Sequence, residues 1–421
     1  MNTTRGSRAG EVTGRTRQLE RGRAAWADWR WRAAFDALSD ADHEGGLDAD
    51  DLAALAVAAY LIGREADATA IWTRAHHAFI DIGERTGAAR CGFWLSLTAL
   101  LRGEGALGGG WLARTERLLD DVDGECVEGG LLLVLRGVMM LFGGDAARAS
   151  AMLSRASELG TRLGDADLLA LALLGRGQAA VALGDAAGAV DHFDEAMITV
   201  TAGEVSPLIT GVVYCAVILA CQDIFDLHRA RQWTRVLAHW CSRQPELVTF
   251  RGKCLVHRSE VMQLDGDWRA AAAEAQRACD ELSQATGAGG GIAFYRRAEL
   301  HRLCGEVDAA ERLYQAASER GYEPQPGLSM LRLAQGKVDA AAGAIRRLAD
   351  ETKGPSRARI LGCYIEIMLA AGEREGARAA ADELAEIAGA YDSPWLRASA
   401  AQSGGAVLLA EGDASAALAK L

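Results

Sequence analysis

Apolar positions recur along the chain in segments of helical spacing that end in short turns. A glycine, often followed by an acidic residue, ends each segment except the one near Phe225, where the copy is degenerate, and an alanine comes five positions after that glycine. A large apolar residue or another alanine follows four positions later, and a small or apolar residue three later still. Because residues three and four apart share one face of a helix, the pattern predicts a helix, a tight turn and a second helix. Its clearest copy spans Leu173 to Met197, with landmarks at Gly177, Gly184, Asp185, Ala189, Phe193 and Ala196.

This frame repeats with a steady step. Its alanine position falls at residues 68, 108, 149, 189, 230, 271, 310, 341, 377 and 417, with glycine in place of alanine at 108. The successive steps are 40, 41, 40, 41, 41, 39, 31, 36 and 40 residues. One helical hairpin cannot bury its apolar face alone, whereas stacked hairpins bury a continuous core. We therefore predict an all-α stack of about ten to eleven helical hairpins.

The residue types of the frame suit this interpretation. Glycine tolerates the left-handed backbone that ends many helices. An acidic residue beside it lies at the start of the next helix, where backbone N–H groups and the helix dipole favour negative charge. Alanine five residues on allows two helices to cross closely. The six prolines and the lack of alternating β-branched runs give no sign of strands.

The landmarks Gly177, Gly184, Ala189, Phe193 and Ala196 resemble the tetratricopeptide repeat in order and size. That resemblance implies a right-handed superhelical solenoid in which the first helix of each hairpin lines a concave groove. The period near 40 residues is longer than the roughly 34 of that family, and the family's proline after the second helix is mostly absent. Armadillo and HEAT repeats have a similar period, but the Gly-acid turn and the Ala-x3-Phe spacing favour the tetratricopeptide interpretation.

A second resemblance is broader. The long period, the bias to Ala, Gly and Arg, and the segment Ala58 to Ala75 are similar to the helical-repeat sensor region of large LuxR-type transcriptional regulators of the MalT-like group, over roughly residues 25–421. In that family a helix-turn-helix usually follows the repeats, and some members carry a G-x-x-x-x-G-K-[ST] loop. Neither motif occurs here. The resemblance therefore implies a sensor part without its DNA-reading part.

We divide the chain into a flexible basic tail that runs into the first helix, residues 1–23, and a helical repeat domain, residues 24–421. The last copy of the frame stops four residues after Ala417, which makes its second helix too short to be stable alone. We expect this repeat to be truncated and the natural protein to continue past Leu421.

Charge and composition exclude several classes of function. The net charge of −12 argues against general affinity for nucleic acid. The nine cysteines form no C-x-x-C pair, so we expect buried thiols instead of a zinc site or disulfides. No apolar run reaches the roughly 18–20 residues of a membrane span, and the N-terminus lacks the apolar region of a secretory signal. We therefore expect a cytoplasmic protein without a membrane partner.

No catalytic or metal-binding motif is found. The run from Gly287 to Gly291 follows a helical segment and lacks Lys-Ser/Thr, so we interpret it as a linker. His76 and His77 are adjacent and project in different directions, which prevents both from binding one metal. No H-E-x-x-H or G-x-S-x-G occurs. We predict no cofactor, no metal and no enzymatic activity, and we assign most tryptophans, including Trp72 and Trp94, to packing.

Candidate groove residues lie on the first helices of the central copies. They combine hydroxyl, aromatic and basic groups, which suit an anionic or amphipathic guest, although an ordinary solvated groove is an equal alternative. These residues are Thr210, Tyr214, Arg251, His257, Tyr295 and Arg296.

Two functions follow from these patterns. The first is a sensor domain of a LuxR-type regulator that binds a small-molecule effector or a protein in its groove, with DNA read only by a helix-turn-helix outside this chain. The alternative is a scaffold that recognises a peptide or helix. A homodimer is compatible with both.

Overall fold

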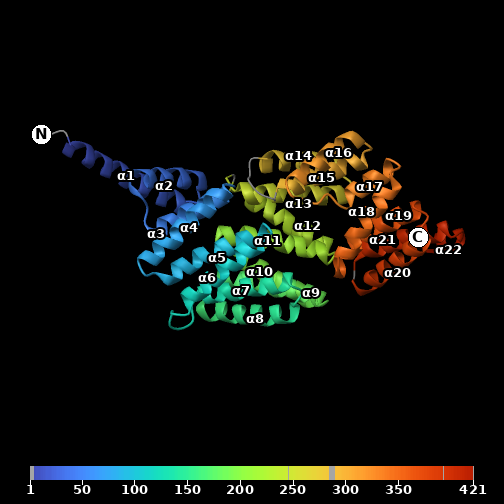
Figure 1. Cartoon of the computed structure of the whole chain (residues 1–421), viewed down its shortest axis with the longest axis horizontal. Helices are drawn as coiled ribbons and strands as arrows, with labels where there is room; N and C mark the ends of the chain where they lie inside the picture. The colour runs from blue at the N-terminus through green and yellow to red at the C-terminus, as the bar shows by residue number, and fades with distance from the viewer. Residues whose placement is uncertain (1–3, 245, 284–289, 392, 421) are drawn as a thin grey trace. The chain divides into compact units, whose positions relative to one another are not determined.

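Helices follow one another as hairpins throughout the residues that the computed structural model describes, which are 4–244, 246–283, 290–391 and 393–420. No strand occurs in these ranges, and the predicted all-α stack of helical hairpins is confirmed (Figure 1). The number of repeats and the handedness of a superhelix stay predictions.

The helices of the first half are α1 (Thr4–Ala27), α2 (Trp31–Gly45), α3 (Ala49–Leu61), α4 (Glu65–Asp81), α5 (Arg85–Leu101), α6 (Gly105–Leu119), α7 (Val127–Phe142), α8 (Ala146–Leu163), α9 (Ala166–Ala182), α10 (Ala186–Thr201) and α11 (Pro207–Asp223). Those of the second half are α12 (Leu227–Ser242), α13 (Val248–Leu264), α14 (Trp268–Ser283), α15 (Gly291–Leu303), α16 (Val307–Glu319), α17 (Gly327–Ala334), α18 (Val338–Glu351), the 3₁₀ turn η2 (Gly354–Arg357), α19 (Ala358–Ala370), α20 (Arg374–Ala390), α21 (Pro394–Ala410) and α22 (Ala414–Lys420).

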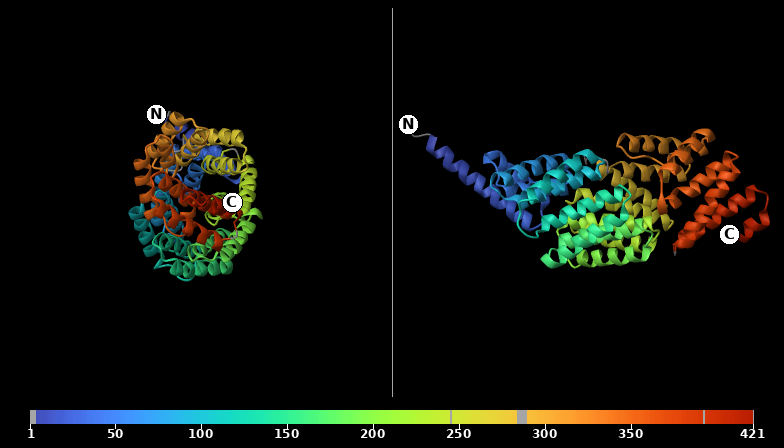
Figure 2. Two further views of the ribbon diagram at one scale, coloured as in Figure 1. Left: turned by 90° about the vertical axis from the view of Figure 1, so that its right-hand side faces the viewer. Right: turned by 60° about the horizontal axis from the view of Figure 1, so that its bottom comes forward.

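The chain divides into two compact units. Unit 1 comprises Met1–Ala216, Val236–Cys254 and Asp280–Gly287, and unit 2 comprises Val217–Arg235, Leu255–Cys279 and Ala288–Leu421. From α1 to α10 each helix packs against the next, and the first helix α7 also packs against the first helices on either side of it, α5 and α9. Figure 2 shows α7 to α10, coloured teal to green, side by side. In unit 2 the first helices α17, α19 and α21 pack in the same way.

The turn glycines have the left-handed backbone that the frame requires. Gly184 has a φ of 81°. Its N–H donates to the carbonyl of Val181 at 3.0 Å, and the next N–H, of Asp185, donates to the carbonyl of Ala180 at 2.9 Å. These two bonds form the Schellman motif, which satisfies carbonyls at the end of α9. The other turn glycines of the frame have φ between 74° and 93°: Gly63, Gly103, Gly144, Gly266, Gly305, Gly336, Gly372 and Gly412.

Aspartate and glutamate differ in whether they cap the helix after the turn, although both occur at the same position of the repeat frame. The carboxylate of Asp185 accepts the N–H of Gly188 at 2.9 Å, and that of Asp145 accepts the N–H of Arg148 at 3.2 Å. Glu104, in the same place before α6, makes no side-chain cap bond. The shorter aspartate side chain can reach back to the first turn of the helix, so aspartate caps it while glutamate contributes only its charge.

The small residues of the frame lie where helices cross. Every alanine of the frame is buried, with exposed fractions from 0% at Ala68 to 6% at Ala417. At Gly108 a Cβ atom would lie 2.7 Å from Cγ of Leu100 and 3.2 Å from the carbonyl oxygen of Ser96, so α5 and α6 approach more closely than alanine allows. The short step of 31 residues has a local cause, because α17 between the two alanines has only eight residues.

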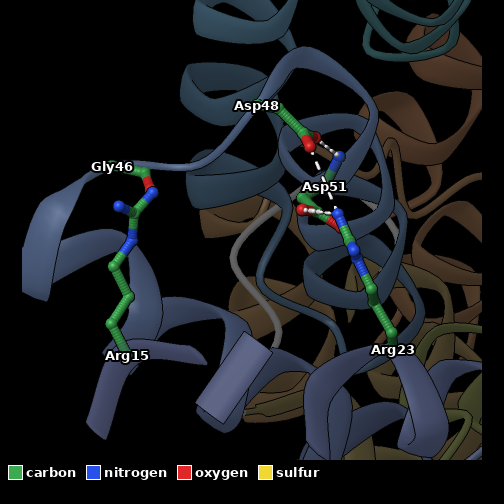
Figure 3. A network of polar contacts seen from close by, with 5 residues as sticks. All are labelled: Arg15, Arg23, Gly46, Asp48 and Asp51. Atoms are coloured by element: carbon green, nitrogen blue, oxygen red, sulfur yellow. Dashed lines mark hydrogen bonds and ion pairs between the residues drawn. The ribbon is translucent and has the colours of Figure 1, made fainter. Parts of the chain in front are cut away.

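Helix α1 is tied to the loop between α2 and α3, as Figure 3 shows. The guanidinium of Arg23 donates to both carboxylate oxygens of Asp51 at 2.8 and 2.7 Å and pairs with Asp48 at 3.2 Å. Asp48 also caps α3 by accepting the N–H of Asp51 at 2.8 Å. Nearer the start of α1, Arg15 donates to the carbonyl of Gly46 at 2.5 Å. Basic residues assigned to a tail and first helix therefore hold this helix on its neighbours.

The predicted linker from Gly287 to Gly291 falls mainly outside the described residues, and α15 begins at its last glycine. Leu421, past which we expect the natural protein to continue, also lies outside them, and that expectation stays a prediction.

Candidate binding cleft

A cleft of about 530 Å³ lies in unit 1. Residues of α3, α4, the α4–α5 turn, α5 and the start of α7 line it. Side chains recur at spacings of three and four on α3 and four on α5, so each helix presents one face to it. Its volume lies within the range of about 300–1,000 Å³ common for ligand pockets. The charged residues and tryptophans that line it are Asp50, Trp72, Glu84, Arg90, Trp94 and Glu128. We refer to this cavity as the unit 1 cleft.

Two stacked tryptophans form one wall of the unit 1 cleft. The rings of Trp72 on α4 and Trp94 on α5 lie 5.9 Å apart with an interplanar angle of 11°. Trp72 is 1% exposed and is supported by Tyr60, whose ring is 5.8 Å away. Trp94 is only half-buried, and the edge of Phe93 packs against it at 5.0 Å. The pair therefore fixes a rigid aromatic surface of which Trp94 is the accessible part.

An ion pair joins α5 to α7 across the unit 1 cleft. Both Nε and Nη2 of Arg90 donate to Oε1 of Glu128, at 3.0 and 2.6 Å. The side chain of Glu128 is 7% exposed, whereas that of Arg90 is 56% exposed. The two residues are 38 positions apart, close to one repeat, so the repeat itself aligns them. A buried carboxylate needs such a partner, because leaving it unpaired would be strongly destabilising.

The shape of the unit 1 cleft depends on a glycine. A Cβ atom at Gly87 would lie 2.5 Å from Cδ1 of Phe79, so the ring of Phe79 rests directly on the backbone of α5. Both residues line the cleft. A side chain at position 87 would push α4 and α5 apart or displace this ring.

The thiol in the unit 1 cleft is not activated. Burial raises the pKa of Cys91 to about 12, and the nearby carboxylate of Asp50 acts in the same direction, while Arg90 opposes it. A thiolate is the reactive form of cysteine, so Cys91 stays protonated near neutral pH. The unit 1 cleft is thus arranged for recognition by charge, shape and aromatic contact.

Three of the predicted groove residues lie in unit 1 outside the unit 1 cleft. Thr210 is 4% exposed and donates its hydroxyl to the carbonyl of Val205 at 3.2 Å. Tyr214 is 3% exposed and its ring packs 5.9 Å from that of Trp240, and burial raises the pKa of Tyr214 to about 12. Arg251 forms an ion pair with Glu281 at 3.2 Å. Their predicted role in ligand binding stays a prediction.

The other three predicted residues lie in unit 2, where two of them converge on one carboxylate. Arg296 on α15 pairs with Oε1 of Glu260, and Nδ1 of His257 lies 3.7 Å from Oε2 of the same residue. Gln222 on α11 donates to Oε2 at 2.8 Å. Glu260 is 8% exposed, and this buried network links three successive first helices. Burial lowers the pKa of the Arg296 guanidinium, although arginine remains charged near neutral pH.

Tyr295 belongs to a neighbouring aromatic cluster in unit 2. Its ring lies 5.9 Å from that of Tyr314 and 5.2 Å from that of Tyr322. The hydroxyl of Tyr314 donates to Glu299, whose carboxylate also pairs with Arg302 at 2.9 Å. Burial, with the nearby carboxylate, raises the pKa of Tyr295 well above its usual value. The predicted residues are therefore distributed between two units, three in each.

Sequence reasoning did not single out the residues of the unit 1 cleft. The assignment of Trp72 and Trp94 to packing agrees with their stacked rings, but it does not show that Trp94 is only half-buried and lines the cleft. The four-residue step from Arg90 to Trp94, and the one-repeat step from Arg90 to Glu128, are signals in the sequence that could have found the site.

Metal and membrane sites are absent from what the structure describes. No group of three or more His, Cys, Asp or Glu side chains there is arranged to hold a metal ion. None of the helices, over the described ranges, is both long and apolar enough to cross a bilayer.

Comparisons with known proteins show loose likenesses of fold. No protein-family model matches the chain, and no curated protein is similar to it in sequence. Yeast Tom70 is similar over 97% of this chain and 91% of that one, with 14% identity and a TM-score of 0.40. The Rap protein complexed with competence and sporulation factor covers 96% and 99%, with 11% identity and a TM-score of 0.44. The human IFIT1 dimer with m7Gppp-AAAA covers 96% and 98%, with 12% identity and a TM-score of 0.47. At such values these likenesses carry no argument about function.

Proposed function

We propose that the chain is a non-catalytic helical-repeat scaffold that binds an extended or helical segment of a protein partner in the unit 1 cleft. The observation that carries the proposal is the cleft itself. It crosses the first helices of three successive hairpins and combines a fixed aromatic wall with charged groups. Clefts of this kind, apolar in part and with a few placed polar groups, are where ligands are bound.

The rigidity of the unit 1 cleft supports recognition of a defined partner. Its walls are helices held by neighbouring hairpins, and its central ion pair between Arg90 and Glu128 ties two of them together. A preformed site loses less conformational entropy on binding than one that must be ordered by its ligand. We therefore expect peptides to bind with little change in the backbone.

Selection of peptides on the folded full chain tests the proposal. Random peptides displayed on phage should yield binders of micromolar affinity, as expected for a modest interface. Substitution of Ala53, a half-buried residue that lines the unit 1 cleft, by arginine should weaken these binders at least ~10-fold, because the long side chain occupies the cleft. The matched control is Ala70→Arg, an exposed position of α4 outside the cleft.

The proposal fails if the selected peptides bind the Ala53→Arg and Ala70→Arg variants equally well. Circular dichroism and thermal unfolding of both variants establish that the comparison is made between folded proteins. A loss of binding in both variants would also contradict a site in the cleft, because Ala70 does not line it.

A narrower form of the proposal follows from the sequence resemblance to LuxR-type regulators. In that form the scaffold is a sensor part, and DNA is read by a helix-turn-helix in a longer natural chain. The net charge of −12 is consistent with a part that does not hold DNA itself. A gel-shift assay should detect no sequence-specific DNA binding by these 421 residues and should detect it with a longer chain. Specific binding by the 421 residues alone would contradict this division.

A further inference from the structure

We infer that the unit 1 cleft selects a cationic side chain, lysine or arginine, of its partner. This inference rests on the proposed function and adds the chemistry of the residue that enters the cleft. Its basis is that carboxylates from α3, the α4–α5 turn and α7 line the same cleft as the half-buried Trp94.

Charge in the unit 1 cleft is strongly unbalanced. The lining contains the carboxylates of Asp50, Glu84 and Glu128 and a single guanidinium, that of Arg90. Arg90 is already paired with Glu128. Asp50 and Glu84 are exposed, and among the described residues neither side chain forms an ion pair or hydrogen bond. An incoming cation therefore gains two uncompensated carboxylates, whereas an incoming anion is repelled by them.

Glu128 provides a second, independent observation. Both hydrogen bonds from Arg90 end on its Oε1 atom. Within the described part of the chain, Oε2 accepts no hydrogen bond, although the side chain is only 7% exposed and lines the cleft. This oxygen is not sealed in the interior, so it is open to a charge-assisted hydrogen bond from a lysine ammonium or an arginine guanidinium that enters the cleft.

The aromatic wall suits the same side chain. Lysine and arginine place their apolar stems along apolar surfaces while their charged ends reach polar groups. The face of an indole ring also attracts a nearby cation, and tryptophan does so more strongly than tyrosine or phenylalanine. Trp94 is half-buried and lines the cleft, and its stacking on Trp72 fixes the orientation of the ring. The charged end of a lysine or arginine side chain would thus lie near the carboxylates, and its apolar stem would lie along the indole ring.

Three heptapeptide pools test the inference directly. The pools share the same mixed flanking residues and differ only at the centre, which is lysine, norleucine or glutamate. Binding to the full chain is measured by fluorescence anisotropy at low and moderate salt. We expect the lysine pool to bind at least ~10-fold more tightly than the glutamate pool and several-fold more tightly than the norleucine pool, with a preference that decreases as salt screens the charges.

A double variant of the unit 1 cleft identifies the groups responsible. Asp50→Asn with Glu84→Gln removes two negative charges and leaves the pair between Arg90 and Glu128 intact. We expect the lysine pool to lose about 5- to 10-fold in affinity, as removal of close charge complementarity does, while the norleucine pool is unchanged. The matched control is Asp36→Asn, an exposed acidic position on α2 outside the cleft, which should leave the preference for lysine intact.

The outcomes separate this inference from the proposed function. If the norleucine or glutamate pool binds as tightly as the lysine pool and Ala53→Arg abolishes that binding, the cleft is a binding site and the inference is wrong. If no pool binds, or if Ala53→Arg leaves binding unchanged, the proposed function fails and the inference fails with it. A preference for lysine that survives the double variant also contradicts the inference.

Discussion

Both units bring together segments far apart in the sequence, but they do so with different chemistry. In unit 1 the indole N–H of Trp31 donates to Oε1 of Gln244 at 3.4 Å across 213 positions, and the backbone N–H of Arg32 donates to Glu246 at 2.8 Å. In unit 2 the rings of Phe225 and Trp395 stack at 5.3 Å with an interplanar angle of 8°. We call these the polar and the aromatic closing contact.

In the aromatic closing contact, the residue that makes the contact itself has an unfavourable backbone. Phe225 occupies the turn position at which the other copies of the frame have glycine, and its φ is 60°. A left-handed backbone is unfavourable for a residue with a side chain by roughly 1–2 kcal/mol. The ring is 4% exposed, and its carbonyl accepts the hydroxyl of Ser393 at 3.0 Å. In unit 1 the turn before α2 has a left-handed residue as well, Trp29 with a φ of 58°, but its side chain is 49% exposed and is not one of the groups of the polar contact.

The comparison shows that a turn residue can keep an unfavourable backbone conformation when its side chain gains a contact with a distant repeat. A phenylalanine at the turn is retained because its ring finds an aromatic partner 170 positions away, which offsets strain in the turn. In the polar contact the left-handed residue and the contacting residues are different, because Trp29 has the positive φ while Trp31 and Arg32 make the hydrogen bonds.

Removal of the ring of Phe225 should have the largest effect on this comparison. Phe225→Ala loses the stacked ring and keeps the left-handed turn, so we expect a decrease in the free energy of unfolding of about 3–5 kcal/mol. Phe225→Gly loses the same ring but relaxes the turn, so it should be less destabilised by roughly 1–2 kcal/mol. Urea denaturation of both variants checks the order. Equal stability of the two variants would show that the turn of Phe225 is not strained.

Loss of the polar closing contact should cost less. Gln244→Met keeps the length of the side chain and removes the acceptor for the indole N–H of Trp31, so we expect a loss of about 1 kcal/mol. Hydrogen exchange of the amides in α2 should increase. Gln178→Met on α9 is the matched control, because no described residue hydrogen-bonds to that side chain. A loss as large as that of Phe225→Ala would contradict the view that unit 1 relies on weaker closing contacts.

The closing contacts also mark the limit of what the sequence could predict. The turn glycines, the acidic turn residues and the buried alanines follow from local physics repeated about every 40 residues. The structure has the glycines and alanines in place, and the acidic residue caps the helix where it is Asp145 or Asp185 but not where it is Glu104. The irregularity near Phe225 was visible in the sequence. Its cause was not, because Trp395 lies several repeats away and a periodic pattern carries no information about such pairs.

The unit 1 cleft was missed for a related reason. A tryptophan at helical spacing is usually core, and only the folded structure distinguishes the half-buried Trp94 from the buried Trp72. In the same way, Tyr214 has the residue type of a binding site but is 3% exposed against Trp240. The helix face on which a residue lies can be predicted from spacing, whereas the burial of its side chain depends on which residues of the neighbouring repeats cover it.

The two units also surround their buried histidines with opposite charges. In unit 1 the ring of His76 is fully buried, and Nε2 accepts from Nε of Arg114 at 2.8 Å. Nδ1 therefore carries the proton, which it donates to the carbonyl of Ala88 at 2.8 Å. In unit 2 the ring of His257 lies beside the carboxylate of Glu260. Burial, with Arg114 acting in the same direction, lowers the pKa of His76.

The smallest predicted effect is a dependence of the stability of unit 1 on pH. The unfolded chain takes up a proton at position 76 near the ordinary histidine pKa of about 6.5, whereas the folded chain resists it. The unfolded state then binds more protons, so the contribution of His76 to stability is present above that pH and decreases as the pH falls below it. Hydrogen exchange of α4 to α6 should be faster at pH 5.5 than at pH 7.5. His76→Gln should reduce this acid sensitivity, because glutamine does not titrate, while the exposed neighbour His77→Gln should not. An unchanged pH response in His76→Gln would show that the buried ring is not the group that senses acid, and the contrast with unit 2 would then lose its electrostatic basis.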